Sequence, residues 1–293
     1  MRLGRVDGMT STELGNLTYP ATQPSVADVE RALALAVRAP SIHNTQPWRF
    51  VLTPDALELW ADRRRQLPTT DLDGRALLLS CGGALYLAGL GLAAQRWRTA
   101  VERMPDPGEP DLLARVRFVG RHPADGPVPL LAAAAAQRRH TERRPFRPGV
   151  VSTVLLDSLC AAIEDRALYG HVVMRPAERL DLAAAVSWAA GLEEQPAYLV
   201  VFSREDDAAT RLRAGEAYVR VSVEAERLAL ASSAMTQAVD LPAVRERFRA
   251  LMDWPDHPQM VLRVGWPPAE PAGAPTPRRP LSAVLTVQDQ PED

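Results

Sequence analysis

The sequence contains no lysine, since all 34 of its basic residues are arginine. This absence excludes a lysine Schiff base, and any bound phosphate must be held by guanidinium groups, which form two parallel hydrogen bonds to such an anion. The 36 acidic residues give a formal net charge of -2. Without an excess of positive charge, we expect no binding to nucleic acid and none to an anionic membrane.

Cysteine and histidine are too few and too scattered to predict a metal centre. Cys81 and Cys160 lie far apart, and His122, His171 and His257 are isolated, so neither set has metal-ligand spacing. With no disulfide framework and no pattern typical of a secretory signal, we expect a cytoplasmic protein. The sequence also lacks Gly-x-Gly-x-x-Gly and Gly-x-x-x-x-Gly-Lys, which removes the usual evidence for a dinucleotide fold or a P-loop.

Charged residues are also absent between Arg75 and Arg96, so a membrane span has to be weighed against a buried helix. The run contains Gly82, Gly83 and Gly89 among many alanines, and small residues of this kind suit close helix packing. We therefore expect a buried core helix and no membrane span.

Apolar periodicity divides the rest of the chain into two cycles of helices and strands, with a boundary at 121–127, where Pro and Gly interrupt the pattern. A capping box at Ser25 and Asp28 predicts the start of the first helix. Helices are expected at about 25–37, 74–101, 129–139, 152–165, 208–231 and 243–251. Strands are expected at about 48–52, 57–61, 114–119, 169–174, 197–202 and 259–265, before an apolar stretch at 281–287.

The two cycles repeat each other weakly. Each cycle has a long helix that we expect to begin at a glycine (Gly74 and Gly215), followed by a Pro-Asp pair and an Arg-Val strand. Corresponding residues of the two cycles are about 140 to 150 positions apart. So long a period with only two copies indicates duplicated domains and not a solenoid.

The segment at 39–50 contains Pro-Ser-Ile-His-Asn-Thr-Gln-Pro-Trp. It resembles the Pro-Ser-x-x-Asn-x-Gln-Pro-Trp loop that follows the first helix of FMN-dependent nitroreductases, with all six fixed positions present. The resemblance implies that four residues of this loop contact the flavin, namely Pro40, Ser41, Ile42 and Asn44, with Asn44 along the ring edge. His43 lies at a variable position, while Gln46 and Trp48 are expected to support the loop. The alternative is an Asx-type turn without a ligand.

A second segment, 137–146, carries four arginines within seven residues, which is a strong pattern for binding an anion. It resembles the Arg-Arg-x-Ser-x-Arg pattern that nitroreductases carry near their amino terminus, although here it lies in the middle of the chain. The resemblance implies that Arg139 and Arg143 meet the FMN phosphate or ring edge, with Thr141 at the serine position and His140 beside it. A solvated run of charge is the alternative.

Two further segments match the family by position. The basic stretch at 275–281 is similar to the segment that closes the family's phosphate site, which makes Arg278 a candidate ligand. Thr236 and Gln237, after the long helix, match the loop that offers a main-chain N–H to flavin N5. An ordinary solvated tail and an ordinary loop are the alternatives.

An ordinary nitroreductase chain carries both main motifs and forms two flavin sites at a symmetric dimer interface. Here each half carries one motif, which is similar to the Acg-like subfamily of FMN-binding nitroreductase relatives. The implied fold class is α+β, with two tandem nitroreductase-like halves that form an intrachain pseudo-dimer. The expected divisions are a flexible arm at 1–23, a ring-binding half at 24–122, a phosphate-binding half at 123–287 and a tail at 288–293.

The resemblance also implies a reaction, in which FMN N5 takes hydride from NAD(P)H and passes it to a small nitroaromatic, quinone-like or other organic acceptor. The alternative is a protein that binds or sequesters FMN with little or no turnover. We expect no metal, nucleic acid or membrane as a partner, and either a monomer or a homodimer.

Overall fold

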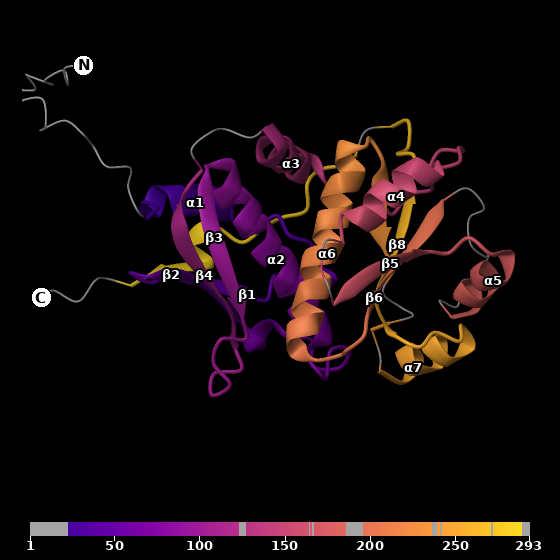
Figure 1. Ribbon diagram of the computed structural model, residues 1–293, viewed down its shortest axis with the longest axis horizontal. Helices are drawn as coiled ribbons and strands as arrows, with labels where there is room; N and C mark the ends of the chain where they lie inside the picture. Colours follow the sequence, from indigo (N-terminus) through magenta and orange to yellow (C-terminus); the bar gives the residue numbers. More distant parts are fainter. Residues whose placement is uncertain are drawn as a thin grey trace, which may run out of the picture.

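The computed structural model has two β-sheets on either side of a central layer of helices, so the α+β class is confirmed (Figure 1). It describes residues 23–122, 127–163, 165, 167–185, 196–235, 239–240, 242–270 and 272–288. The expected arm and tail therefore lie outside the described residues, apart from Gln23 and Gln288.

The first helix, α1 (Val26–Ala36), begins where the capping box predicts. The Ser25 side chain accepts a hydrogen bond from the Asp28 N–H, and the Asp28 carboxylate accepts one from the Ser25 N–H. The buried face of α1, including Val29 and Leu33, packs in the main core with helix α2 (Arg75–Ala94).

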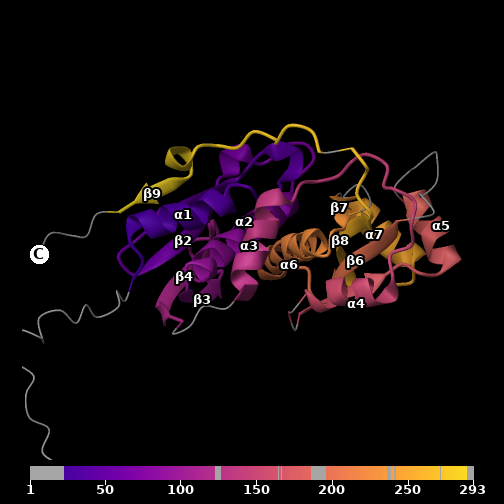
Figure 2. The same ribbon diagram turned by 90° about the horizontal axis from the view of Figure 1, so that it is seen from above.

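The first sheet has five strands in the order β3-β4-β2-β1-β9. These are β3 (Trp97–Arg103), β4 (Leu112–Arg121), β2 (Ala56–Ala61), β1 (Trp48–Leu52) and β9 (Leu285–Val287). The carboxyl-terminal strand β9 pairs in parallel with β1, so the end of the chain returns to the sheet formed by its beginning. Figure 2 shows this return as a yellow segment that runs along one side of both sheets.

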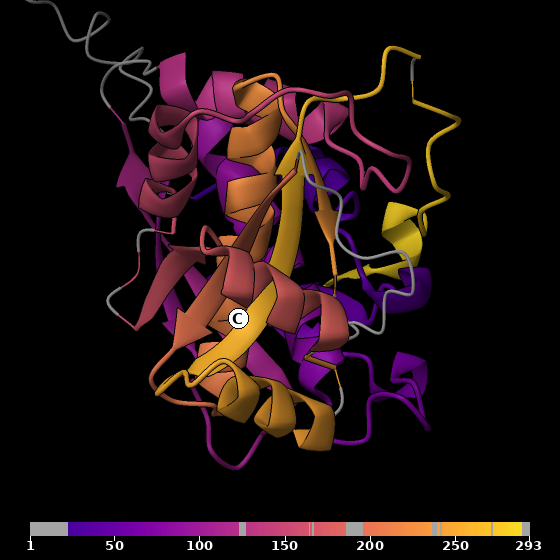
Figure 3. The same cartoon turned by 90° about the vertical axis from the view of Figure 1, so that its right-hand side faces the viewer.

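The second sheet has four antiparallel strands in the order β5-β6-β8-β7. These are β5 (Leu168–Val172), β6 (Ala197–Ser203), β8 (His257–Gly265) and β7 (Ala231–Ala234). Helix α6 (Ala208–Arg227) covers one face, and α5 (Pro176–Ala185) and α7 (Pro242–Leu251) cover the other (Figure 3). Strand β6 is therefore buried on both faces, because Leu199 faces the main core while Val200 faces α5 and α7.

The remaining helices complete the inner layer. Helix α3 (Pro127–Arg138) packs beside α2 and α6, and α4 (Thr153–Ala161) packs against α6 and β5. Three short 3-10 turns lie at η2 (Ile42–Asn44), η3 (Arg63–Arg65) and η4 (Leu281–Ala283).

Helices α2 and α6 cross in direct backbone contact. A Cβ atom added to Gly82 would lie 2.0 Å from the Leu212 carbonyl oxygen, and one added to Gly215 would lie 2.0 Å from the Leu79 carbonyl oxygen. The contact is reciprocal, since each helix places a glycine against the backbone of the other. Glycine is required at both positions because any side chain would force the two helices apart.

The long apolar helix predicted at 74–101 is shorter than expected. Helix α2 ends at Ala94, Arg96 adopts a left-handed conformation with φ of 71°, and β3 follows. Along β3 every second residue (Arg98, Ala100 and Glu102) is more exposed than its neighbours, which is the period-two pattern of a strand that the prediction missed. Helix α2 is long and apolar enough to cross a membrane, but most of it is buried within the protein. The expected buried helix is confirmed.

The second long helix also differs from its prediction. It ends at Arg227, and residues 231–234 form β7. It begins at Ala208, so Gly215 marks the helix crossing and not a helix start. Helix α5 was not predicted.

We expect Gly82→Ala to lower the free energy of unfolding by about 1–3 kcal/mol or more, because the new methyl group meets main-chain atoms of α6. Gly89→Ala is the matched control on the same helix, since a Cβ there meets nothing within 4 Å. It should leave stability unchanged or raise it by up to about 1 kcal/mol. Urea unfolding of both variants measures the difference, and equal stabilities would show that the crossing tolerates a side chain.

Candidate anion-binding site

The loop at 40–48, which carries the Pro-Ser-x-x-Asn-x-Gln-Pro-Trp pattern, is held in an unusual backbone conformation. His43, Asn44 and Gln46 have φ values of 46°, 57° and 48°, in the left-handed region that non-glycine residues seldom occupy. The Ser41 hydroxyl accepts a hydrogen bond from the Gln46 N–H at 2.9 Å, and the Ile42 N–H points to the Ser80 hydroxyl at 3.4 Å. Such clusters of left-handed residues persist only where the surroundings fix them, and they concentrate at functional sites.

The carboxyl-terminal segment holds this loop, although the two are more than 230 residues apart in the sequence. The Asn44 amide nitrogen donates to the Pro277 carbonyl at 3.0 Å, and its oxygen accepts from the Arg278 guanidinium at 3.2 Å. The Gln46 side-chain oxygen accepts from the Arg279 N–H at 2.8 Å. The Arg279 guanidinium donates to the main-chain carbonyls of Gln46 and Trp48. Loop and segment therefore form one structural unit.

Three arginines meet beside this unit, and we call Arg38, Arg139 and Arg278 the arginine cluster. The Arg139 and Arg278 guanidinium groups both donate to the Arg38 main-chain carbonyl, at 3.2 and 3.3 Å. Arg139 is only 6% exposed. Each of the three retains a buried Nε atom without a hydrogen-bond partner, and none of them pairs with a carboxylate in the part of the chain that the structure describes.

Burial and mutual repulsion both act on the charges of the cluster. Burial lowers the pKa of the Arg139 guanidinium, and the neighbouring Arg38 lowers it further. Burial likewise lowers the pKa of Arg278, with Arg139 and Arg38 as the further causes. Buried cations with no anionic partner are unfavourable, so this arrangement is suited to an anion that supplies the missing charge. A phosphate matches the fork geometry of guanidinium groups.

The segment that follows Arg139 is anchored to the second sheet. The Glu142 carboxylate binds the Arg144 guanidinium at 2.7 Å, and the Glu142 N–H donates to the Ser232 carbonyl at 3.0 Å. The Arg263 guanidinium donates to the main-chain carbonyls of both Glu142 and Arg144. Hydrogen bonds from Arg144 are the main cause that lowers the pKa of Glu142 to about 2, despite its burial.

The structure thus brings together three of the predicted site residues, Asn44, Arg139 and Arg278. Asn44, which the family resemblance assigns to the ring edge, contacts Arg278 directly. Arg143 is exposed and has no polar partner among the residues described. Thr236 and Gln237 lie outside the described residues.

The other predicted residues are placed as follows. Pro40, Ser41 and Ile42 line the loop with half-buried side chains. Thr141 bridges to Ser232 of β7 through the main chain, and the ring of His140 is exposed, with Nε2 at 3.2 Å from the Glu142 carboxylate.

Arg38 was not predicted from the sequence. Its position in the sequence could have indicated it. Arg38 lies two residues before Pro40, at the end of the first helix, so its basic side chain is close to the loop at 40–48. Only the fold shows that its carbonyl is the point at which Arg139 and Arg278 converge.

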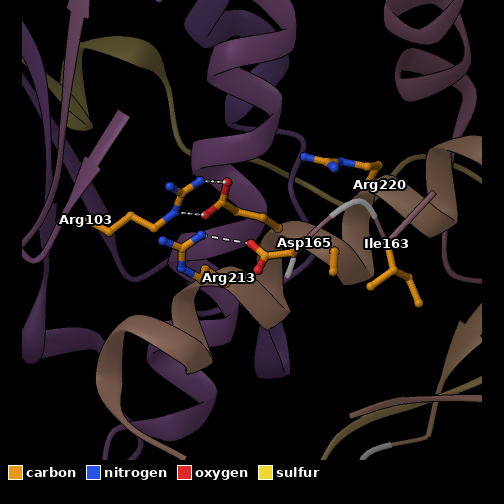
Figure 4. A pocket seen from close by; sticks show the side chains of 7 residues that line it. Arg103, Ile163, Asp165, Arg213 and Arg220 are labelled. Carbon is orange, nitrogen blue, oxygen red and sulfur yellow. Dashed lines mark hydrogen bonds and ion pairs between the residues drawn. The ribbon is translucent and has the colours of Figure 1, made fainter. Parts of the chain in front are cut away.

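A separate cavity of about 200 Å³ lies between α6 and the first sheet (Figure 4). Two of its three arginines are paired with acidic residues of the cavity itself, and the third, Arg220, lies over the ring of Tyr86. Arg103 binds Glu216 at 2.6 and 2.8 Å, and Arg213 binds Asp165 at 2.9 Å. Carboxylates therefore already neutralise Arg103 and Arg213, whereas no member of the arginine cluster has such a partner among the described residues.

The lowered pKa of Glu142 gives a testable pH dependence. Because the folded pKa is about 2 against an ordinary 4.5, the carboxylate stabilises the fold above about pH 4.5, and this contribution is lost as the pH falls towards 2. At pH 7, Glu142→Gln should be less stable than the wild type by about 1.5–3 kcal/mol. Urea unfolding between pH 7 and 3 should show the gap closing below pH 4.5, and a constant gap would contradict this role.

Comparison with known proteins agrees with the resemblance of the loop. No family model matches the chain. Rv3131 of Mycobacterium tuberculosis, named as an NAD(P)H nitroreductase, is 34% identical, and the alignment covers 89% of this chain and 92% of that protein. The protein acg of the same organism, also named as an NAD(P)H nitroreductase, is 29% identical, with 92% of this chain and 98% of that protein covered.

A solved structure agrees on the fold. The crystal structure of a protein from Anabaena variabilis ATCC 29413, described as a nitroreductase, matches with a TM-score of 0.60 at 11% identity. The match covers 84% of this chain and 90% of that one, so the likeness extends over most of the fold. The chain therefore belongs to the nitroreductase family of oxidoreductases, as its Pro-Ser-x-x-Asn-x-Gln-Pro-Trp loop predicts.

Proposed function

We propose that this protein is an FMN-dependent oxidoreductase that takes hydride from NAD(P)H and reduces a small organic acceptor, such as a nitroaromatic or a quinone. The observation that carries the proposal is the arginine cluster, which is short of negative charge and lies in contact with the nitroreductase loop through Asn44 and Arg278. FMN carries a phosphate at one end and a redox-active ring at the other, so it matches both the arginine cluster and the nitroreductase loop.

The phosphate fits the cluster better than any neutral group would. Arg139 and Arg278 each retain a buried nitrogen without a partner, and a phosphate dianion accepts several hydrogen bonds while it neutralises the repelling charges. Arg143 is exposed on the same anchored segment and is a further candidate for the phosphate or the ring edge.

The ring is assigned to the loop at Pro40–Asn44 by the family resemblance, with Thr236 and Gln237 near N5 on the same ground. When bound, FMN supplies two-electron chemistry at N5, between NAD(P)H and the acceptor. The chain's own contribution is to hold the loop rigid, through the Ser41–Gln46 hydrogen bond, and to fix Arg278 through Asn44.

We further propose that the chain is an intrachain pseudo-dimer of two nitroreductase-like halves. The reciprocal helix contact supports this, because one offset of 133 residues relates Leu79 to Leu212 and Gly82 to Gly215. A two-fold relation between equal halves produces such paired contacts, in which each element meets the other through the same surface.

The same offset explains why only one flavin site is expected. Ser80, on α2, lies under the loop, and the residue 133 positions later on α6 is Arg213, which binds Asp165 in the turn after α4. The position equivalent to the flavin site is thus the cavity of Figure 4, which two ion pairs occupy. One complete site within one chain also needs no second copy of the protein.

We expect flavin released from the purified protein to be FMN, at about one per chain, and the bound flavin to be bleached by anaerobic addition of NADPH or NADH. Extraction of two flavins per chain, or of FAD, would contradict the single composite site. Bound FMN that neither nicotinamide reduces would instead favour a protein that sequesters the cofactor.

Arg139→Met should weaken FMN binding roughly 10- to 100-fold, because hydrogen bonds to charged groups contribute about 1.5–3 kcal/mol. Methionine preserves most of the buried volume. Arg138→Met is the matched control, since Arg138 is the adjacent residue but is exposed and paired with Glu226 at 3.1 Å. Fluorescence titration of flavin-free protein with FMN compares them, and equal affinities would mean that Arg139 does not bind the cofactor.

A further inference from the structure

We propose that the guanidinium of Arg38, at the end of α1, binds the same phosphate as Arg139 and Arg278, so that one anion joins the two halves of the chain. The proposal rests on the proposed function only for the source of the anion, which is FMN. Its chemistry is that of any phosphate monoester dianion or of inorganic phosphate. Neither the loop motif nor the arginine motif of the sequence includes Arg38.

The position of the Arg38 side chain is the first observation. Its Nη2 atom donates to the Gln137 carbonyl at 2.5 Å, at the end of α3 and two residues before Arg139. Its main-chain carbonyl accepts from Arg139 and Arg278. The end of α1 therefore contacts the other two members of the cluster through both its main chain and its side chain.

The charge balance is the second observation. Arg38 lowers the pKa of both Arg139 and Arg278, so its positive charge lies close to theirs. The acidic groups that raise the pKa of Arg139 are Tyr218 and Glu226, both on α6, and Glu226 already binds Arg138. Three guanidinium groups thus share one site without a carboxylate among the described residues to balance them, and a dianion is the natural counter-charge.

Access is the third observation. A hollow of about 420 Å³ lies directly beside Arg38, between α1 and the end of α3. It is lined by Arg31, Ala34, Leu35, Arg38 and Gln137. Arg38 is half-buried and lines this hollow, so part of its side chain is open to an anion from solvent.

These three observations predict that the anion acts as a cross-link. The three arginines come from the end of α1, the end of α3 and the carboxyl-terminal segment, and without the anion their mutual repulsion works against the packing of these elements. Binding to the folded state alone raises its stability by mass action. Phosphate should therefore stabilise the flavin-free protein, and riboflavin, which lacks the phosphate, should do so much less.

The test compares flavin-free wild type with Arg38→Met and with the control Arg31→Met. Arg31 lies on the same helix, two turns earlier, lines the same hollow and is exposed. Either substitution keeps the main chain, so Arg38→Met removes the guanidinium but not the carbonyl that holds Arg139 and Arg278. Inorganic phosphate, FMN and riboflavin are each titrated while the melting temperature and the affinity for flavin are recorded.

We expect Arg38→Met to bind FMN at least tenfold more weakly than the wild type, to lose most of the phosphate-dependent rise in melting temperature, and to bind riboflavin as before. Arg31→Met should behave as the wild type. Wild-type affinity of Arg38→Met for FMN and phosphate would overturn the proposal, and so would an equal loss of FMN and riboflavin binding, which would mark a general effect on the loop. If Arg38→Met does not fold, Arg38→Gln is judged by the same outcomes. Failure of the wild type to bind FMN would instead refute the proposed function.

Discussion

The close crossing of α2 and α6 is the constraint on which the rest of the molecule depends. Backbone contact at Gly82 and Gly215 fixes the distance between the two sheets. Helix α2 then carries Ser80 under the loop at 40–48, while α6 lies beside Arg139 and supplies Glu226 to its neighbour Arg138. A larger separation would move the loop from the arginines, because the two parts of the site are attached to opposite sides of this crossing.

The arginines on the two sides of the α2–α6 crossing differ in whether they are paired with carboxylates. On one side the arginine cluster has no carboxylate partner within the described ranges, and on the other Arg103 and Arg213 are each paired with an acidic residue. Paired guanidinium groups gain little from a further anion, whereas unpaired and buried ones gain both hydrogen bonds and charge neutralisation. The difference gives a physical reason why the proposed pseudo-dimer should bind one FMN and not two.

Local patterns in the sequence were sufficient for much of the fold and for the family. The capping box at Ser25 and the hairpin of β1 and β2 could be predicted because neighbouring residues determine them. Strand β3 was missed because an apolar helix runs almost directly into it, and only Gln95 and the left-handed Arg96 separate the two. The role of Arg38 and the attachment of residues 277–279 to the loop depend on contacts between distant segments, which no local pattern records.

The central claim is that the arginine cluster holds the phosphate of FMN as a dianion, and ³¹P NMR of the bound cofactor tests it directly. The second pKa of a free phosphate monoester is about 6, so its resonance shifts between pH 8 and 5. Guanidinium groups favour the charged form, so the resonance of bound FMN should stay constant over this range. A bound phosphate that titrates like free FMN would show that it lies in solvent and not in the arginine cluster.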